Sequence, residues 1–151
     1  MKIVLIGASS DIAQQLVSDK GNNYQFVEVS SSNSSFDVQN EESYPDIEGG
    51  IDGLVYFPGS INLRPFSSLK LSDFQNDYEI NVLGLIKVLK HYHKSFNENA
   101  SLVFISSIAA SVGMPFHSSI SASKSAIEGL CRSLAAEWSP KVRVNCVAPS
   151  L

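Results

Sequence analysis

The chain has few of the residues that mark a secreted, membrane-spanning or nucleic-acid-binding protein. Among its 151 residues are two cysteines, one tryptophan and 11 basic against 15 acidic side chains, which gives a net charge of −4 at pH 7. A surface for nucleic acid carries clustered Lys and Arg, so this charge balance argues against one. No apolar run approaches the roughly 20 residues that a helix needs to cross a bilayer. We therefore expect neither nucleic acid nor a membrane among the partners.

The two cysteines and the N-terminal run exclude further features. Cys131 falls on a face of a predicted helix and Cys146 in a predicted buried strand, and both positions suit inert core thiols better than a disulfide. The run Lys2–Ile6 is too short for a signal peptide and continues directly into a glycine turn. No group of His, Cys and Asp residues has the spacing of metal ligands, so we predict no metal site. These features predict a cytoplasmic protein.

What the chain does contain is typical of one ordinary globular domain. Apolar residues make up 44% of it and charged residues 17%, and its length suffices for one substantial core. Short apolar segments alternate with segments whose apolar residues recur at helical spacing. The predicted strands are 2–6, 24–29, 51–57, 101–106 and 142–147, and the predicted helices are 11–18, 71–96 and 119–138. This alternation predicts an α/β protein with a parallel sheet that is covered on both faces.

The segment Gly7–Ala13 follows the first predicted strand and opens the first helix, which is the setting of a dinucleotide-binding turn. Small residues let backbone N–H groups approach a pyrophosphate closely, and the N-terminus of the helix favours an anion. Asp11 is unexpected there, because its carboxylate would repel a phosphate unless it caps the helix and turns away. A plain strand–turn–helix without a ligand would show the same pattern.

A second motif combines Ser107 with the segment Ser119–Gly129. Ser107 ends an apolar run, Ile120 follows it by 13 residues, and Lys124 follows Ile120 by four. The arrangement resembles the catalytic segment of the short-chain dehydrogenases/reductases, in which a tyrosine occupies the place of Ile120. The resemblance implies that Ser107 hydrogen-bonds the substrate oxygen and that Lys124 binds the nicotinamide ribose. The tyrosine is the family's proton donor or acceptor, so Ile120 leaves the usual mechanism without its acid.

The resemblance extends over the whole chain and implies a site for a nicotinamide dinucleotide. Ile51–Gly59 is similar to the family's Asp-x-Leu-Val-Asn-Asn-Ala-Gly segment, and Asn81 matches the helix asparagine that helps to hold the lysine through water. Asp37 resembles the residue that receives the adenine amine, with Val38 packing on the ring. The cofactor-binding residues implied in this way are Gly7, Ser9, Ser10, Asp11, Ile12, Ser30, Ser31, Asp37, Val38, Pro58, Gly59, Asn81, Lys124 and Pro149.

The end of the second predicted strand bears on the choice of cofactor. An acidic residue there would bind the adenosine ribose and repel a 2′-phosphate. The chain has Ser30, Ser31 and Ser32 instead, and hydroxyls tolerate a phosphate better than a carboxylate does. The serines therefore favour NADP over NAD, unless they form only a solvated loop.

The missing acid calls for a substitute, because hydride transfer to a carbonyl leaves an alkoxide that must be protonated or stabilised. Ile120 can do neither. His117 lies about one helical turn before it and has an ordinary pKa near neutrality, so it is the natural replacement. A lone histidine before a helix can equally be structural. The candidate catalytic residues are Ser107, Lys124, Asn81 and His117.

The resemblance also sets expectations for the fold and the assembly. It implies a Rossmann-like, doubly wound parallel sheet with the strand order 3-2-1-4-5-6, in which Phe36–Val38 supplies a short third strand. Members of the family continue past Pro149 with a substrate-binding flap and another strand. We therefore expect residues 1–151 to form a single NAD(P)-binding domain without that C-terminal part. The family's four-helix interface implies a homodimer or homotetramer through residues 71–96 and 119–138.

Three functions remain open from the sequence. The first is an NAD(P)-dependent oxidoreductase for a small carbonyl or alcohol substrate, with an altered proton donor or with Ser107 and Lys124 acting through water. The second is a catalytically silent sensor or scaffold that binds NAD(P). The third is a structural or assembly partner that keeps only the fold. The retained Ser107, Lys124 and Asn81 favour the first two functions, because a pure scaffold has no physical need for a lysine at position 124.

Overall fold

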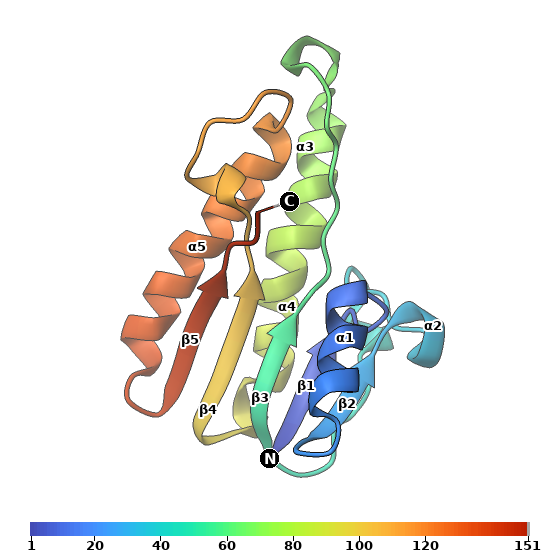
Figure 1. The fold of residues 1–151 in the computed structure, drawn as a ribbon, viewed down its shortest axis with the longest axis vertical. Coiled ribbons are helices and arrows are strands. Elements are labelled where there is room, and N and C mark those ends of the chain that lie inside the picture. The colour runs from blue at the N-terminus through green and yellow to red at the C-terminus, as the bar shows by residue number, and fades with distance from the viewer. Residues whose placement is uncertain (151) are drawn as a thin grey trace.

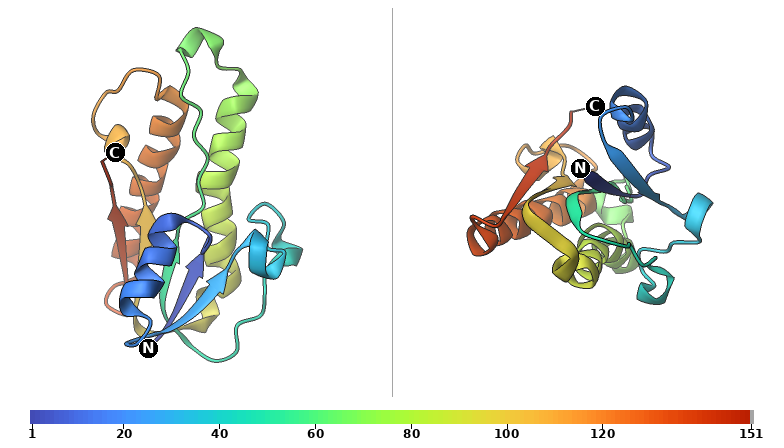
Figure 2. Two further views of the ribbon diagram at one scale, coloured as in Figure 1. Left: turned by 45° about the vertical axis from the view of Figure 1, so that its right-hand side comes forward. Right: turned by 90° about the horizontal axis from the view of Figure 1, so that it is seen from below.

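A computed structural model describes residues 1–150, apart from the side chain of Asn33. The strands are β1 (Lys2–Ile6), β2 (Gln25–Val29), β3 (Ile51–Tyr56), β4 (Phe96–Ile105) and β5 (Val142–Val147), and the α-helices are α1 (Asp11–Lys20), α2 (Ser31–Ser34), α3 (Leu71–Tyr78), α4 (Gly84–Tyr92) and α5 (Ser118–Trp138). All five strands are parallel and lie in the order β2-β1-β3-β4-β5 (Figure 1). α1 lies on one face of the sheet, and α4 and α5 lie on the opposite face (Figure 2). The predicted Rossmann-like parallel sheet is confirmed.

The prediction of a short strand at Phe36–Val38 is wrong. The sheet therefore lacks the third strand of the predicted order 3-2-1-4-5-6, and β2 is the edge strand. The segment is irregular, although Phe36 and Val38 are both buried. The backbone of its central residue, Asp37, is hydrogen-bonded to a side chain instead of to β2. The Asp37 N–H donates to Ser43 Oγ (2.9 Å), and the same hydroxyl donates to the Asp37 carbonyl (3.0 Å). A segment whose polar groups are paired in this way does not need a neighbouring strand.

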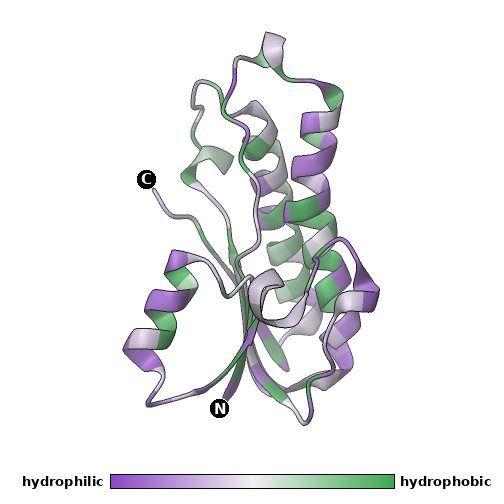
Figure 3. Cartoon of the chain, turned by 90° about the vertical axis from the view of Figure 1, so that its right-hand side faces the viewer, coloured by the Kyte–Doolittle hydropathy of each residue, from purple (hydrophilic) through white to green (hydrophobic). Residues whose placement is uncertain are grey.

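The central strands are apolar because they are covered on both faces. Val4, Leu5 and Ile6 of β1 are completely buried, as are Leu54 of β3 and Leu102 of β4. α1 is less apolar, and hydrophilic and hydrophobic bands alternate along it in Figure 3. This pattern is typical of a helix that packs on a sheet with one face only.

The predicted helix 71–96 is interrupted at Glu79–Leu83 by one π-helical turn, which separates α3 from α4. Within this turn, the carbonyl of Ile80 accepts a hydrogen bond from the hydroxyl of the buried Tyr56 of β3 (2.6 Å). Asn81 lies inside this turn. π-helical turns are often found at functional sites, and this one sets the direction of the Asn81 side chain.

Gly84 allows the close packing of this turn. A Cβ atom on Gly84 would lie 2.6 Å from Val38 Cγ2 and 2.7 Å from the Tyr56 hydroxyl oxygen. We expect Gly84→Ala to lower the free energy of unfolding by roughly 1–3 kcal/mol, since such overpacking forces the neighbours apart. Gly129→Ala in α5 is the matched control, because nothing lies within 4 Å of its Cβ position. That change should stabilise the helix by up to about 1 kcal/mol. Urea denaturation of both variants tests the prediction, and equal effects would contradict it.

The same helical region also ends earlier than predicted, because β4 begins at Phe96 instead of residue 101. Phe96 pairs with Ile51 of β3, and the register then shifts before Gly53 pairs with Ser101. The Phe96 ring packs at 6.2 Å from that of Trp138 at the end of α5. Side-chain packing of this kind extends the strand over residues whose polar sequence does not favour it.

Both cysteines are free thiols, as predicted. Burial raises the pKa of Cys131 and raises that of Cys146 to about 11. The reactive thiolate is therefore scarce at neutral pH in both side chains. No helix in residues 1–150 has the length and apolar content needed to cross a membrane.

Candidate cofactor and active site

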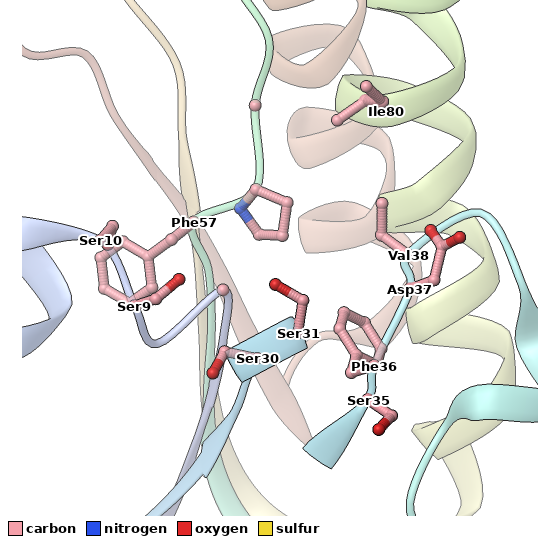
Figure 4. A pocket seen from close by; sticks show the side chains of 13 residues that line it. Ser9, Ser10, Ser30, Ser31, Ser35, Phe36, Asp37, Val38, Phe57 and Ile80 are labelled. Carbon is pink, nitrogen blue, oxygen red and sulfur yellow. The ribbon is translucent and has the colours of Figure 1, made fainter. Parts of the chain in front are cut away.

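The carboxyl ends of β1, β2 and β3 surround a cavity of about 750 Å³. Ligands bind at such strand ends in open α/β sheets, at the point where the chain reverses its order of strands. Most of the predicted cofactor residues meet there (Figure 4). The lining residues are Gly7, Ser9, Ser10, Ser30, Ser31, Ser35, Phe36, Asp37, Val38, Phe57, Pro58, Gly59 and Ile80.

The turn after β1 has the tight geometry that a phosphate-binding loop requires. Gly7 has a φ of +78°, and a Cβ atom there would lie 2.9 Å from Pro58 Cδ. Ser10 is the N-cap of α1, and its hydroxyl accepts from the Ala13 N–H (3.3 Å). The suggestion that Asp11 caps the helix is therefore wrong, because Ser10 already occupies that position.

Asp11 and Ile12 are the first two residues of α1, and both are exposed. Neither lines the cavity. The Asp11 carboxylate thus lies outside the cavity. Inside the cavity it would repel a phosphate more strongly. The two residues stay predicted cofactor contacts at the entrance of α1.

The outer end of the cavity is formed by the serines after β2 and by the segment around Asp37. Ser30 is buried, with its Oγ 2.9 Å from Ser32 Oγ. Ser31 is exposed and points into the cavity (Figure 4). Asp37 Oδ1 accepts from the Gln39 N–H (2.9 Å), and among the described lining residues Asp37 is the one charged side chain.

Sequence reasoning missed part of this lining. Phe36 and Phe57 contribute rings, and Ile80 faces the cavity from the π-helical turn (Figure 4). Each of the three directly precedes a predicted site residue, and this adjacency is the signal that the sequence offers.

A second group of residues meets at Gly59, one end of the same cavity. A Cβ atom on Gly59 would lie 3.1 Å from Asn81 Oδ1 and 3.5 Å from Lys124 Nζ. These two polar atoms border the space next to the Cα atom of Gly59. We call this space the Gly59 notch. Asn81 Nδ2 donates to the Asp77 carbonyl (2.8 Å), whereas Asn81 Oδ1 is buried and has no hydrogen-bond partner within residues 1–150. A buried acceptor without a partner is costly, so this atom fits a site that a ligand or a water completes.

Lys124 is the cation of the Gly59 notch. It is 7% exposed, and its Nζ donates to the Ile105 carbonyl (2.8 Å). Burial lowers the pKa of Lys124 to about 8, because a buried ammonium loses its hydration. Its proton is therefore held weakly enough to be exchanged near neutral pH.

Ser107 and Pro149 lie at the adjoining strand ends. The Ser107 hydroxyl accepts from the Ala109 N–H (3.2 Å) at the start of a short 3₁₀ turn. The Ile108 N–H donates to the Pro149 carbonyl (3.3 Å), which joins the segments after β4 and β5. Ile120 is 3% exposed and adds no polar atom.

His117 is placed just before α5, where it is partly exposed. Its Nδ1 lies 2.6 Å from the Pro115 carbonyl. No hydrogen bond recorded for residues 1–150 joins its ring to Ser107, Asn81 or Lys124. In the structure, the hydrogen bond of the His117 ring goes to Pro115 and not to another candidate catalytic residue. Within the same residues, no group of three or more His, Cys, Asp or Glu side chains could hold a metal ion.

Comparison with known proteins agrees with this geometry. A family model described as enoyl-(acyl carrier protein) reductase matches residues 3–151. Hydroxynaphthalene reductase arp2 of Aspergillus fumigatus is 32% identical over 103 residues, which are 68% of this chain and 38% of that protein. D-threitol dehydrogenase of Mycolicibacterium smegmatis is 34% identical over 106 residues, 68% of this chain and 41% of the relative. The chain thus spans about two fifths of the length of these relatives.

Solved structures have the same fold. The protein lin1944 of Listeria innocua superposes with a TM-score of 0.87 at 22% identity, over 99% of this chain and 77% of that one. A small-chain dehydrogenase in complex with NADPH superposes with a TM-score of 0.88 at 20% identity, over all of this chain and 70% of that one. The chain belongs to the short-chain dehydrogenase/reductase family.

Proposed function

We propose that the chain is an NAD(P)-dependent oxidoreductase that acts on a small carbonyl or alcohol substrate with an altered proton donor. The observation that carries the proposal is the Gly59 notch, where Lys124 and the unpartnered Asn81 Oδ1 meet at the end of a 750 Å³ cavity. Ser107 ends the next strand. These are the places where the family holds the nicotinamide ribose and the substrate oxygen.

The hydride would come from a bound dinucleotide, and the chain's own residues would handle the proton. Asn81 Oδ1 can orient a water in the Gly59 notch. Lys124 can release a proton to this water while the water gives one of its own to the alkoxide oxygen, because the pKa of Lys124, about 8, lies close to neutral pH. Ser107 can donate a hydrogen bond to the substrate oxygen, since its bond with the Ala109 N–H uses only an oxygen lone pair. Ile120 provides an apolar wall. His117 is a second candidate acid if its ring turns from the Pro115 carbonyl.

For the cofactor we propose NADP in preference to NAD. Ser30 and Ser31 lie at the end of β2 where an acid would repel a 2′-phosphate, and both line the cavity. We assign to Asp37 the role of receiving the adenine amine and to Val38 that of packing on the ring, since both line the cavity. We place the protein in the cytoplasm, where two free thiols are stable.

The other candidate is a catalytically silent NAD(P) sensor or scaffold, and the observation that favours it is the buried Ile120 in place of an acid. A partner that keeps only the fold would bind no dinucleotide at all. Fluorescence titration with NADPH tests binding, and a panel of carbonyls and alcohols then tests turnover.

Gly59→Ala provides the site-specific control for that titration. Its methyl group would enter the Gly59 notch, 3.1 Å from Asn81 Oδ1, and we expect roughly tenfold weaker binding from the loss of one hydrogen-bonded contact. Gly113→Ala is the matched variant, because nothing lies within 4 Å of its Cβ position. The proposal fails if the unaltered chain binds neither NADPH nor NADH.

We also propose that the chain forms a homodimer or homotetramer through α4 and α5. Ile86 and Leu89 of α4 and Leu130 and Leu134 of α5 line one groove between the two helices, and Leu83 is 37% exposed nearby. Light scattering at micromolar concentration should report at least twice the monomer mass of 16.4 kDa. Leu134→Glu should shift the mass toward the monomer, since an unpaired charge is costly in an interface. A monomeric unaltered chain would contradict this assembly.

A further inference from the structure

Asp77 is a completely buried carboxylate on α3. Its Oδ1 accepts hydrogen bonds from Ser60 Oγ (2.5 Å) and Asn62 Nδ2 (3.0 Å), and its Oδ2 accepts from Ser119 Oγ (2.6 Å). None of the ion pairs found in residues 1–150 includes Asp77. A buried carboxylate that forms no direct ion pair is stable only when donors replace its hydration, and here three donors converge on it.

The three donors come from segments that shape the Gly59 notch. Ser60 directly follows Gly59 in the loop after β3, and Ser119 lies at the start of α5, the helix of the active-site lysine. Asn81 Nδ2 donates both to the Asp77 carbonyl (2.8 Å) and to Ser60 Oγ (3.2 Å). One residue therefore connects the loop, the asparagine and the lysine helix.

We propose that Asp77 is a positioning residue that fixes the Gly59 loop and the start of α5 against α3 and serves as the counter-charge of Lys124. The proposal rests on the proposed function in one respect, namely that the Gly59 notch receives the nicotinamide ribose. An apolar side chain would fill the same space without the cost of a buried charge, so packing alone does not account for a carboxylate there.

The charges around Lys124 single out Asp77. Burial lowers the pKa of Lys124, while Cys146 on β5 and Asp77 on α3 act to raise it. Cys146 is a neutral thiol at pH 7, because its own pKa is about 11. Glu128, on the same helix as Lys124, accepts a hydrogen bond from Ser106 Oγ (2.8 Å). Asp77 is thus the carboxylate on another helix whose charge acts to raise the pKa of Lys124.

Asp77→Asn tests the charge while it keeps the shape. We expect the pKa of Lys124, followed by NMR at its Cε in the cofactor-free chain, to fall by roughly half a unit. Because NADPH binding requires the ammonium, the pH at which binding is half lost should fall by the same amount. Affinity at pH 7 should weaken by less than about twofold, because a half-unit fall from about 8 leaves most of Lys124 protonated at that pH. Asp73→Asn is the control, because it removes the same charge from the same helix and only disturbs the bond that the Lys70 N–H donates (2.8 Å).

Asp77→Leu tests the hydrogen bonds. Amide hydrogen exchange at Ser60–Asn62 and at Ser119 should rise at least about tenfold, as expected for the loss of a shared buried acceptor. An unchanged Lys124 titration in Asp77→Asn overturns the counter-charge role, and unchanged exchange in a folded Asp77→Leu overturns the positioning role. If the Leu variant does not fold, the same exchange measurement on Asp77→Asn decides, because its amide can accept hydrogen bonds at only one of the two former oxygens. Failure of the unaltered chain to bind NADPH would refute the proposed function but not the Lys124 titration, which needs no cofactor.

Discussion

Ile120→Tyr should create or raise carbonyl reductase activity by about 100- to 10,000-fold, the usual contribution of a general acid. Ile120 is buried one turn before Lys124 on α5, so a tyrosine there would place its phenol between the lysine and Ser107. The Lys124 ammonium would then lower the pKa of that phenol, because a nearby positive charge favours the phenolate. Initial rates of NADPH oxidation with a generic small carbonyl measure the effect.

Ile120→Phe is the matched control, since it adds the same ring without the hydroxyl. Both variants should lose roughly 1–3 kcal/mol of stability from overpacking, and only the tyrosine should gain activity. His117→Ala should leave the Tyr variant nearly unchanged, whereas it should abolish any activity of the unaltered chain if His117 is the substitute acid. An Ile120→Tyr variant that folds, binds NADPH and reduces nothing would show that more than the acid has changed.

The sequence predicted the sheet and most of the lining of the candidate cofactor cavity because both depend on local signals. The run Lys2–Ile6 followed by Gly7 marks a buried strand and a tight turn within seven residues, and the structure has both. The spacing of Lys124 along one helix and the position of Gly59 after one strand were equally local. Their meeting at the Gly59 notch followed from the parallel order of β3 and β4.

The features that sequence reasoning missed depend on contacts between distant segments. Phe36–Val38 is not a strand because Ser43 satisfies its backbone, and no pattern of apolar residues contains that information. The π-helical turn depends on the hydroxyl of Tyr56, 24 residues before Ile80. In the sequence, Asp77 is one of several polar residues on a long predicted helix. Its hydrogen bond with Ser119, 42 residues away, is visible only in the structure.

Lys124→Met should weaken NADPH binding at pH 7 by about 10- to 100-fold, the effect of losing a hydrogen bond from a charged group.

Lys124→Met should also stabilise the folded chain. Folding lowers the pKa of Lys124 from 10.5 to about 8, so below pH 8 the folded chain carries a buried charge that the unfolded chain hydrates freely. Removing that penalty raises the free energy of unfolding by at most about 3 kcal/mol at pH 7. The size of the pKa shift sets this upper limit.

The pH dependence of this stability difference follows from proton linkage. Between pH 8 and 10.5 the unfolded chain binds more protons at Lys124 than the folded chain does, so the unaltered protein gains stability as the pH rises through this window. The advantage of Lys124→Met over the unaltered chain should therefore shrink from pH 8 upward, as measured by urea denaturation at pH 7, 8, 9 and 10. Lys90→Met, at an exposed position of α4, should show no such trend. A stability difference that stays constant with pH would mean that Lys124 is not held with a lowered pKa, and the proton path through it would then be excluded.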